Sequence, residues 1–525
     1  MTSQSLPERP NLEQLKNQAK SLLRAARAGE PAALQRFQLL PAPSPDLALH
    51  DAQSVIAREH GFKSWNELRD EVEERTLSFD GAVDEFVRCA TGGAAARSVR
   101  LLARHPGITR ASFYTELVLG DVVAVTARLQ KNPQLAKQAG GVQNWEPLLY
   151  VCHTFLHHDV PERADGLVAI AKELLAHGAN PNAEYHWDWH PELPRTALWA
   201  ALCAANLPAL AEVLLEGGAN PTDGVSMHIT AGSGNLAALE QLFRFGADVN
   251  GIPGGVPPLR YILSWAANEP SRTRGVFWLL EHGADPNLAW SERNDGPLHI
   301  AAERWDVPMV ERLVDRGADI HRRRADGRTP HTIAELHGNA DVAAWLLAHG
   351  AKDELSQLDR FVSTCARGDR GAAEAMLRAH HELRGQLTTE HHLMMQVPAE
   401  HGDAAVLDVM LACGFDAAAK DKDGVTPLHR SAMSGYVDAV RVLLAHGAPV
   451  NALDGMFCAT PLVWAVEGRN HQAGPGRDHV GVARLLIAAG SSVEWVAPEK
   501  APDRERTHEQ LSSLVRAATV ATSPA

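Results

Sequence analysis

The chain has 525 residues, of which 45% are hydrophobic, and its 64 acidic and 50 basic side chains give a formal net charge of −14. This charge disfavours binding to nucleic acid or to an anionic membrane surface, and no apolar run approaches the ~20 residues that cross a bilayer. The six cysteines form no C-x-x-C pair and the N-terminus contains no apolar signal segment, so we expect a cytoplasmic chain without a zinc ribbon.

Residues 9–78 predict a helical segment with a pattern of its own. Its first helix carries one apolar face, formed by Leu12, Leu15, Ala19, Leu22 and Leu23. A proline-rich link, residues 40–47, leads to two more helices; Gly61 ends the first of them, and Ser64 with Glu67 forms a capping box at the start of the second. We expect this segment to cover the apolar face of the unit that follows it.

Residues 423–451 contain one complete structural unit. Its first two residues, Asp-Gly, predict a tight turn. Thr426 is suited to cap a helix N-terminus, and Pro427 then occupies the first helical position. Two short amphipathic helices follow, and Gly447 ends the second as a left-handed C-cap. Helices of this length cannot bury both apolar faces alone, so they need neighbours of the same kind.

The end of this unit, two apolar residues followed by x-x-Gly, recurs along the chain. The closing glycines are Gly178, Gly218, Gly246, Gly283, Gly317, Gly350, Gly414, Gly447 and Gly490. A spacing of 33 residues recurs among them, as between Gly317 and Gly350. A period of about 33 residues with a turn, two helices and T-P-L-H is the signature of ankyrin repeats.

The chain therefore resembles the ankyrin-repeat family. Residues 423–451 follow the family consensus almost throughout, residues 294–303 and 326–339 follow it well, and weaker copies fill the rest of the span. We count about 12 repeats over residues 85–495 and expect an all-α ankyrin-repeat solenoid of helix-turn-helix units. Residues 496–525 predict a C-terminal helix and a frayed tail.

The N-terminal segment 9–78 resembles a helical module found ahead of several bacterial modular proteins, ankyrin ones among them. The abundance of alanine and arginine also suggests a bacterial chain. We expect the module to act as the N-terminal cap of the array, because terminal repeats need a covered apolar face.

The resemblance implies recognition of a protein or peptide rather than a particular chemistry, because fold alone does not determine function. In an ankyrin stack the first helices line a concave surface together with the fingers, the connections from each closing glycine to the next first helix. Inserted residues at 153–166, 180–195, 267–275 and 468–481 depart from a plain scaffold. We expect one unidentified protein or peptide partner, a monomeric chain, and no contact with nucleic acid or membrane.

Aromatic and charged side chains on these elements are the candidates for contact with a partner, because such residues anchor interfaces. The candidates are Tyr150, His153, Tyr185, His186, Trp187, Asp188, Trp189, His190, Tyr261, Glu303, Trp464 and Glu467. The basic run from His321 to Arg324 is expected to be a solvated finger tip.

Other histidines have structural roles in this interpretation. His299 and His429 occupy the T-P-L-H position, where the histidine of the family ties adjacent fingers together. Four more precede closing glycines, where an imidazole favours a helix C-terminus: His177, His282, His349 and His446.

Two alternatives stay open. His153 and His157 would share one helical face if their helix continues that far, and with His158, Asp159 and His186 or His190 they would form a metal site. We assign no metal, cofactor or catalytic residue on this spacing. The rival function is a metal-free enzyme of lyase, cyclase or hydrolase type, with a pocket formed by the inserted loops; a deep pocket near Tyr150, His153 and Trp189 would favour it.

Overall fold

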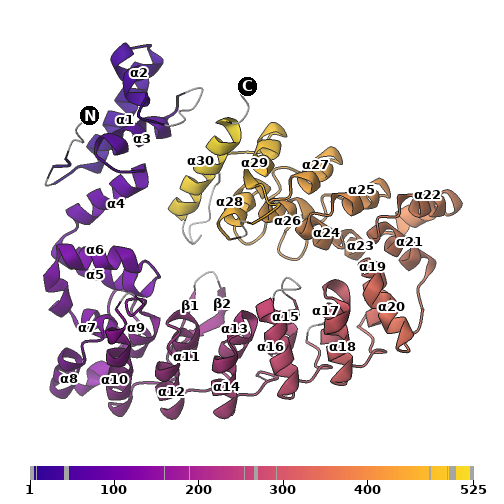
Figure 1. The fold of residues 1–525 in the computed structure, drawn as a ribbon, viewed down its shortest axis with the longest axis horizontal. Coiled ribbons are helices and arrows are strands. Elements are labelled where there is room, and N and C mark those ends of the chain that lie inside the picture. The colour runs from indigo at the N-terminus through magenta and orange to yellow at the C-terminus, as the bar shows by residue number, and fades with distance from the viewer. Residues whose placement is uncertain are drawn as a thin grey trace. The chain divides into compact units, whose positions relative to one another are not determined.

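The computed structural model describes residues 5–7, 9–40, 47–158, 160–187, 190–252, 255–264, 270–290, 292–471, 474–493, 495 and 504–520. Helices make up most of these ranges (Figure 1). The chain divides into two compact units: unit 1 contains residues 1–185 and 195–220, and unit 2 contains residues 186–194 and 221–525. Among the described residues, no helix combines the length and the apolar content of a membrane span.

The N-terminal segment forms a helical module with its own core. Its helices are α1 (Leu12–Arg27), α2 (Pro31–Phe37), α3 (Leu49–Glu59) and α4 (Trp65–Thr76). Leu15, Ile56 and Leu68 are among the buried side chains that hold them together. At the start of α4, Ser64 caps the N–H of Glu67 (3.2 Å), while the Glu67 carboxylate accepts the N–H of Lys63 (2.8 Å), one residue earlier than a capping box would place it.

Ion pairs connect this module to the first repeat within unit 1. Glu74 of α4 is only 1% exposed, and its carboxylate accepts a hydrogen bond from Arg100 (2.7 Å) and lies within 3.6 Å of Arg97 and Arg104. Arg104 also pairs with Glu71 (2.7 Å). A buried carboxylate is tolerated only when it is paired, so ion pairs, which the sequence did not predict, are part of the contact between the module and the first repeat.

The array that follows consists of helix pairs, and the described residues contain twelve of them. The pairs of unit 1 are α5 (Phe79–Thr91) with α6 (Ala95–Arg104), α7 (Phe113–Leu119) with α8 (Val122–Lys131), α9 (Pro147–His153) with α10 (Glu162–Ala176), and α11 (Ala197–Trp199), extended by the π-helix η3 (Ala200–Ala204), with α12 (Pro208–Glu216). The 3₁₀ helices η1 (Pro106–Arg110) and η2 (Pro133–Ala136) lie in the connections.

The remaining eight pairs belong to unit 2. They are α13 (Ser226–Ser233) with α14 (Leu236–Arg244), α15 (Pro258–Leu263) with α16 (Pro270–Glu281), α17 (Pro297–Arg304) with α18 (Val307–Asp315), α19 (Pro330–Leu336) with α20 (Ala340–Ala348), α21 (Gln357–Ala366) with α22 (Arg370–Ala379), α24 (Gln396–His401) with α25 (Ala404–Ala412), α26 (Pro427–Ser434) with α27 (Val437–Ala445), and α28 (Pro461–His471) with α29 (His479–Ala488). Short connecting helices are η4 (His381–Gln386) and α23 (Thr389–Leu393), and α30 (Arg504–Val520) packs on α28 and α29.

First helices pack on first helices, and second helices pack on second helices. In unit 2, α13, α15, α17 and α19 contact one another in turn, and α14, α16, α18 and α20 form the second layer (Figure 1). The unit at residues 423–451 has the predicted form, with Thr426 at the N-cap of α26 and Gly447 after α27 at a φ of +82°. Leu428 and Leu443 are fully buried by the neighbouring helices. Stacking therefore supplies the core that one pair lacks.

The inserted segments take three forms. The inserted finger contains a two-stranded sheet of β1 (Glu184–Trp187) and β2 (His190–Thr196). The segments at 267–275 and 468–481 partly extend helices, because α16 begins at Pro270 and α28 continues to His471.

The third insertion leaves its helix early. Helix α9 ends at His153, and Thr154 donates to the carbonyl oxygen of Val118 (3.0 Å) while the Phe155 N–H donates to Ala90 (3.0 Å). These bonds to two preceding repeats end the helix. His153 and His157 therefore do not share a helical face. The continued helix that the metal alternative required is not formed.

Histidines tie consecutive fingers together, as the resemblance implied. The Nε2 atom of His429 lies 3.1 Å from the carbonyl oxygen of Ala459, and that of His299 lies 3.1 Å from the carbonyl oxygen of Arg322, both in the next finger. The structural role of these two residues is confirmed. His228 makes the same bridge to Val256 (2.6 Å), which the T-P-L-H pattern did not reveal.

An asparagine four residues after the closing glycine also joins consecutive fingers. Asn287 accepts the backbone N–H of Asp319 through Oδ1 (2.8 Å) and donates through Nδ2 to the carbonyl oxygen of Gly317 (2.7 Å), the next closing glycine. We call this arrangement the asparagine clamp. Equivalent residues bind the N–H two positions after the next closing glycine: Asn182 binds Asn220 (2.7 Å), Asn250 binds Asp285 (2.8 Å) and Asn451 binds Ser492 (2.7 Å).

The left-handed backbone at Gly447 predicts a cost for a side chain there. Gly447→Ala should lower the free energy of unfolding by about 1 kcal/mol, because Cβ is unfavourable at positive φ, although the space around the glycine is open. Gly232→Ala is the matched control. Gly232 also has open space but lies within α13, where alanine should raise stability by up to about 1 kcal/mol. Urea unfolding followed by circular dichroism measures both, and shifts of the same sign would contradict this explanation.

Candidate functional site

Aromatic side chains of unit 1 gather around Trp145. Its indole stacks on the ring of Tyr185, with ring centres 4.3 Å apart, and lies 5.0 Å from the imidazole of His153 and 5.5 Å from the ring of Tyr150. Tyr114 of α7 packs on Tyr150 at 4.9 Å. Three predicted site residues, Tyr150, His153 and Tyr185, are thus brought together.

Two of these three residues belong to the interior. Tyr150 is fully buried; its hydroxyl donates to the carbonyl oxygen of Gly140 (2.8 Å) and accepts the N–H of Gln143 (3.1 Å), and burial raises the pKa of Tyr150 to about 12. His153 is 3% exposed, its Nδ1 lies 3.0 Å from the carbonyl oxygen of Leu149, and burial lowers its pKa to about 4. Contrary to expectation, neither side chain offers a surface to a partner.

His157 and His158 serve a different purpose from metal binding. Their Nε2 atoms lie 2.8 Å and 3.1 Å from the same carbonyl oxygen, that of Ala205. They thereby hold the loop after α9 against the end of η3. Across the ranges that the structure describes, no three histidine, cysteine, aspartate or glutamate residues lie close enough to hold a metal ion. Asp159, the remaining member of the alternative, lies outside those ranges.

The tip of the inserted finger falls only partly within the described residues. Asp188 and Trp189 lie outside them, and so do the side chains of Trp187 and His190. The neighbouring His186 is exposed.

The predicted candidates of unit 2 are half-buried and already engaged. Trp464 donates its indole N–H to the carboxylate of Asp454 (2.7 Å). Glu467 accepts a hydrogen bond from Thr507 of α30 (3.3 Å), so the C-terminal helix adjoins this position. Tyr261 meets His228 edge-on, with ring centres 5.2 Å apart.

Unit 2 contains a set of arginines that are each held by a carboxylate. We call them the paired arginines: Arg260 with Asp295 (3.2 Å), Arg304 with Glu303 (2.8 Å), Arg324 and Arg328 with Glu390 (2.7 and 3.0 Å), and Arg430 with Asp421 (3.3 Å). Their side chains are between 8% and 35% exposed. The guanidinium groups are therefore recessed and fixed in orientation, which prepares their remaining N–H groups for directed hydrogen bonds.

Arg324 shows that the basic run His321–Arg324 does not form one solvated tip. Its guanidinium is 8% exposed and pairs with Asp326 and Glu390, and Arg322 donates to the side chain of Asn294 in the preceding finger (3.1 Å). Arg323 instead pairs with Glu354 in the next finger (2.6 Å). Arg324 and Arg328 could not be singled out from the sequence, because their shared partner Glu390 lies more than sixty residues along the chain.

Among the predicted candidates, Glu303 is the one whose carboxylate holds a paired arginine, Arg304. Burial opposes ionisation of this carboxyl, but the charges of His337 and Arg304 outweigh that effect and lower the pKa of Glu303 to about 2. A carboxylate of that pKa is a weak base near pH 7, and so is an imidazole such as that of His153 with a pKa of about 4. Neither side chain suits the acid–base chemistry of the enzyme alternative.

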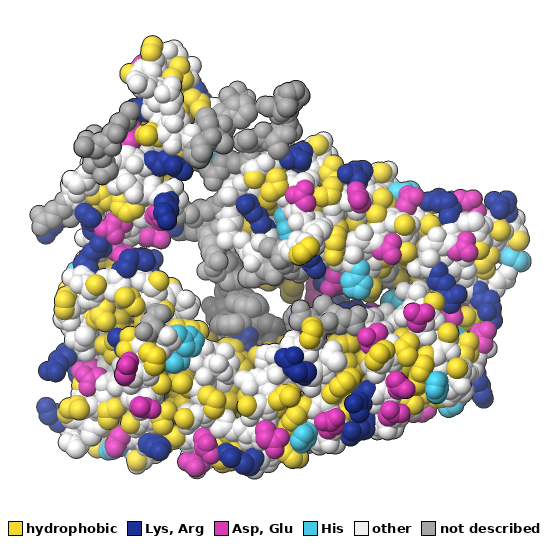
Figure 2. All heavy atoms as spheres, in the orientation of Figure 1, with side chains coloured by type: hydrophobic (Ala, Val, Ile, Leu, Met, Phe, Trp, Pro, Cys, Tyr) yellow, Lys and Arg dark blue, Asp and Glu magenta, His cyan; other side chains and the backbone are white. Residues whose placement is uncertain are grey.

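Acidic and basic side chains intermingle on the visible face of unit 2. Figure 2 shows Lys and Arg next to Asp and Glu along its helices, without a broad area of one sign. A surface of this kind gives short-range contacts more weight than long-range electrostatic steering.

Comparison with known proteins identifies the repeats. Residues 263–356 and 393–494 match the family model of ankyrin repeats. The ankyrin repeat protein nuc-2 of Neurospora crassa is 28% identical over 205 residues, which are 37% of this chain and 18% of that protein. Rabankyrin-5 of Mus musculus is 28% identical over 219 residues, which are 38% of this chain and 19% of that protein. The match thus covers less than a fifth of the length of either relative.

Among solved structures, the human ASB11 ankyrin repeat domain is similar to part of this chain. The match covers 46% of this chain and 100% of the ASB11 chain, with 24% sequence identity and a TM-score of 0.34. The family match and the helix pairs agree: the chain contains ankyrin repeats, and its fold is an all-α ankyrin-repeat solenoid.

The lowered pKa of Glu303 predicts a stability effect that depends on pH. Glu303→Gln should cost about 1–3 kcal/mol at pH 7, because it leaves Arg304 recessed without its carboxylate. The pKa of an unfolded glutamate is about 4.3, so the ionised carboxylate stabilises the fold above about pH 4, and this contribution fades as the pH falls toward 2.

Urea unfolding at pH 7 and at pH 3 tests this dependence. The difference between wild type and Glu303→Gln should shrink at the lower pH. Glu311→Gln, on an exposed position of α18, is the control and should change stability little at either pH. A difference for Glu303→Gln that is the same at both pH values would show that the charge of Glu303 is not the cause.

Proposed function

We propose that the protein binds another protein, or an extended segment of one, through the surface of unit 2 that carries the paired arginines. The observation behind this proposal is that three consecutive repeats, those whose first helices are α15, α17 and α19, carry such arginines, and that α26 carries another, Arg430. Arginine is enriched among the residues that dominate binding energies. Each guanidinium here is fixed by a carboxylate, which lowers the entropy lost when a partner binds.

Aromatic rings accompany the two ends of this set. The guanidinium of Arg260 lies 5.2 Å from the ring centre of Trp290, and that of Arg430 lies 5.8 Å from the ring centre of Trp464. A planar cation next to an aromatic face offers both apolar contact and hydrogen bonds to a peptide. His186, Tyr261 and Trp464 of unit 2 stay in the proposal as additional contact residues, since each keeps an accessible surface.

The organisation of the chain is part of the same proposal. A helical module of the kind that precedes bacterial ankyrin arrays occupies residues 9–78, the array occupies residues 85–495, and a terminal helix follows in residues 496–525. The protein then acts as a monomer, because the module and α30 cover the first and last helix pairs. Its net charge of −14 supports a cytoplasmic protein that avoids nucleic acid and anionic membranes.

Substitution of the outermost paired arginines tests the proposed surface. Proteins captured from a soluble extract by the immobilised full-length chain are identified by mass spectrometry, and the affinity for a purified partner is then measured by calorimetry. Arg260→Met and Arg430→Met should each weaken binding by about 1–3 kcal/mol, since each removes a fixed guanidinium. The control is Arg441→Met on α27, whose side chain is 58% exposed.

Circular dichroism confirms that each variant is folded. Wild-type affinity in both Arg260→Met and Arg430→Met would place the binding surface elsewhere. A loss of affinity in Arg441→Met of the same size would mean that overall charge, rather than the paired arginines, governs binding.

A further inference from the structure

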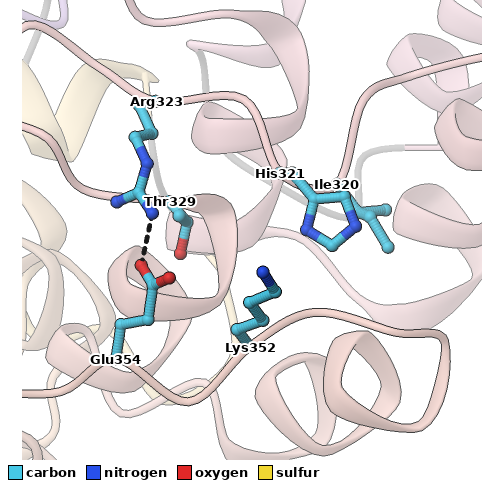
Figure 3. Close-up of a pocket in the computed structure, with 6 residues that line it drawn as sticks. All are labelled: Ile320, His321, Arg323, Thr329, Lys352 and Glu354. Carbon is cyan, nitrogen blue, oxygen red and sulfur yellow. Dashed lines mark hydrogen bonds and ion pairs between the residues drawn. The ribbon is translucent and has the colours of Figure 1, made fainter.

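A pocket of about 160 Å³ lies in unit 2 between two consecutive fingers (Figure 3). The finger after α18 and the finger after α20 both contribute to its lining, which consists of Ile320, His321, Arg323, Thr329, Lys352 and Glu354. None of these residues belongs to the paired arginines. Two of them, His321 and Arg323, come from the basic run His321–Arg324.

The pocket lies where an asparagine clamp is missing. His321 is four residues after the closing Gly317, the position that asparagine holds in the clamp, and Lys352 is two residues after the closing Gly350, the position whose N–H the clamp binds. Side chains of preceding fingers bind that N–H elsewhere: Asn182 binds that of Asn220, Thr222 that of Asp248, Asn250 that of Asp285, Asn287 that of Asp319, His392 that of Asp416 and Asn451 that of Ser492. Over the described ranges, the backbone N–H of Lys352 has no hydrogen-bond acceptor.

The charged groups of the pocket leave one cation without a counter-charge. Arg323 donates to Glu354 (2.6 Å) and to the carbonyl oxygen of Gly327 (2.9 Å), so this pair is neutral and fixed at one edge. In Figure 3, the amine of Lys352 and the imidazole of His321 point into the same space. Within the part of the chain that the structure describes, the side chains of Lys352 and His321 make no hydrogen bond or ion pair.

Two further carboxylates of these fingers are already engaged. Asp353 pairs with Arg360 (2.9 Å), and Asp319 accepts the backbone N–H of His321 (2.8 Å). Thr329, whose side chain is buried, also lines the pocket, but its hydroxyl is already engaged: it accepts the N–H of Thr332 (3.3 Å) and lies 3.2 Å from the Thr332 hydroxyl. The pocket therefore presents a surplus of hydrogen-bond donors and positive charge within a chain whose net charge is −14.

We infer that this pocket binds a phosphate-sized oxyanion, held by the backbone N–H and the ammonium group of Lys352 and by the imidazole of His321. Hydrogen bonds between charged donors and oxyanions are among the strongest in proteins. The volume is several times the ~30 Å³ that a water molecule occupies in the liquid, so a phosphate group fits. The anion is either a free ion or a phosphate group on a side chain of another protein. The inference does not depend on the paired arginines.

Phosphorus NMR of inorganic phosphate tests the inference directly. The line width of the phosphate signal is measured with the full-length protein at constant ionic strength, set with sodium chloride. Wild type should broaden the line, and Lys352→Met should bind phosphate about tenfold more weakly, because it removes a charged donor. Lys422→Met, an exposed lysine of another finger, is the matched control and should behave as wild type.

His321→Asn supplies a second variant with a distinct expectation. An asparagine at this position can form the missing clamp to the N–H of Lys352, which closes the pocket. Phosphate binding should then be lost while the thermal unfolding midpoint rises, whereas a variant that merely misfolds would lower that midpoint.

A short fluorescent peptide with one phosphoserine, compared with its unphosphorylated form by anisotropy, distinguishes the two sources. Binding of inorganic phosphate alone supports a site for the free ion, and additional binding of the phosphopeptide, lost in Lys352→Met, supports recognition of a modified protein. The inference is overturned if wild type binds neither probe, or if Lys352→Met and His321→Asn both bind phosphate as wild type does.

Discussion

The array depends on the hydrogen bonds that join one finger to the next, because a pair of short helices has no core until the next pair is held against it. Histidines such as His299 and His429 bridge fingers near the start of the first helix. The asparagine clamp, as at Asn287, joins them again just after the closing glycine. Both devices satisfy backbone groups that the turns would otherwise leave unpaired. Where one repeat carries both devices, as with Asn287 and His299, two fixed points hold the apolar faces of neighbouring helices in register.

The same joints determine where polar side chains can gather. Because the fingers are held in place, Arg324 and Arg328 meet Glu390 from a repeat more than sixty residues away, and their guanidinium groups become fixed donors. Where a joint is missing, between His321 and Lys352, the two fingers enclose a pocket instead. The proposed interaction surface and the proposed anion pocket thus depend on the same bonds between fingers, which are present near the paired arginines and missing at the pocket.

The sequence was sufficient to predict the helix pairs, because turn residues, caps and apolar periodicity are local properties, as in residues 423–451. It was also sufficient for the left-handed Gly447 and the bridging histidines. The candidate site was harder to predict. Tyr150 was assigned to a surface that contacts a partner, but its side chain is buried and its hydroxyl donates a hydrogen bond to the carbonyl oxygen of Gly140. Such a contact depends on a loop whose path no periodicity encodes.

The paired arginines illustrate the same limit. Glu303 was among the predicted contact residues, but Arg324 was interpreted as part of a solvated run, because its partner Glu390 is distant in sequence. The recurrence of asparagine after closing glycines was visible in the sequence. Its meaning was not, since only the structure shows that the side chain of Asn287 reaches the next finger.

Backbone hydrogen exchange at single-residue resolution tests the central claim, that clamps hold the fingers together and that one of them is missing. After correction for intrinsic rates, the N–H groups of Asp285 and Asp319 should exchange about tenfold more slowly than that of Lys352, because each is bound by an asparagine. Exchange of the Lys352 N–H as slow as that of Asp285 and Asp319 would mean that the finger at His321 is closed like the others, and would contradict the account.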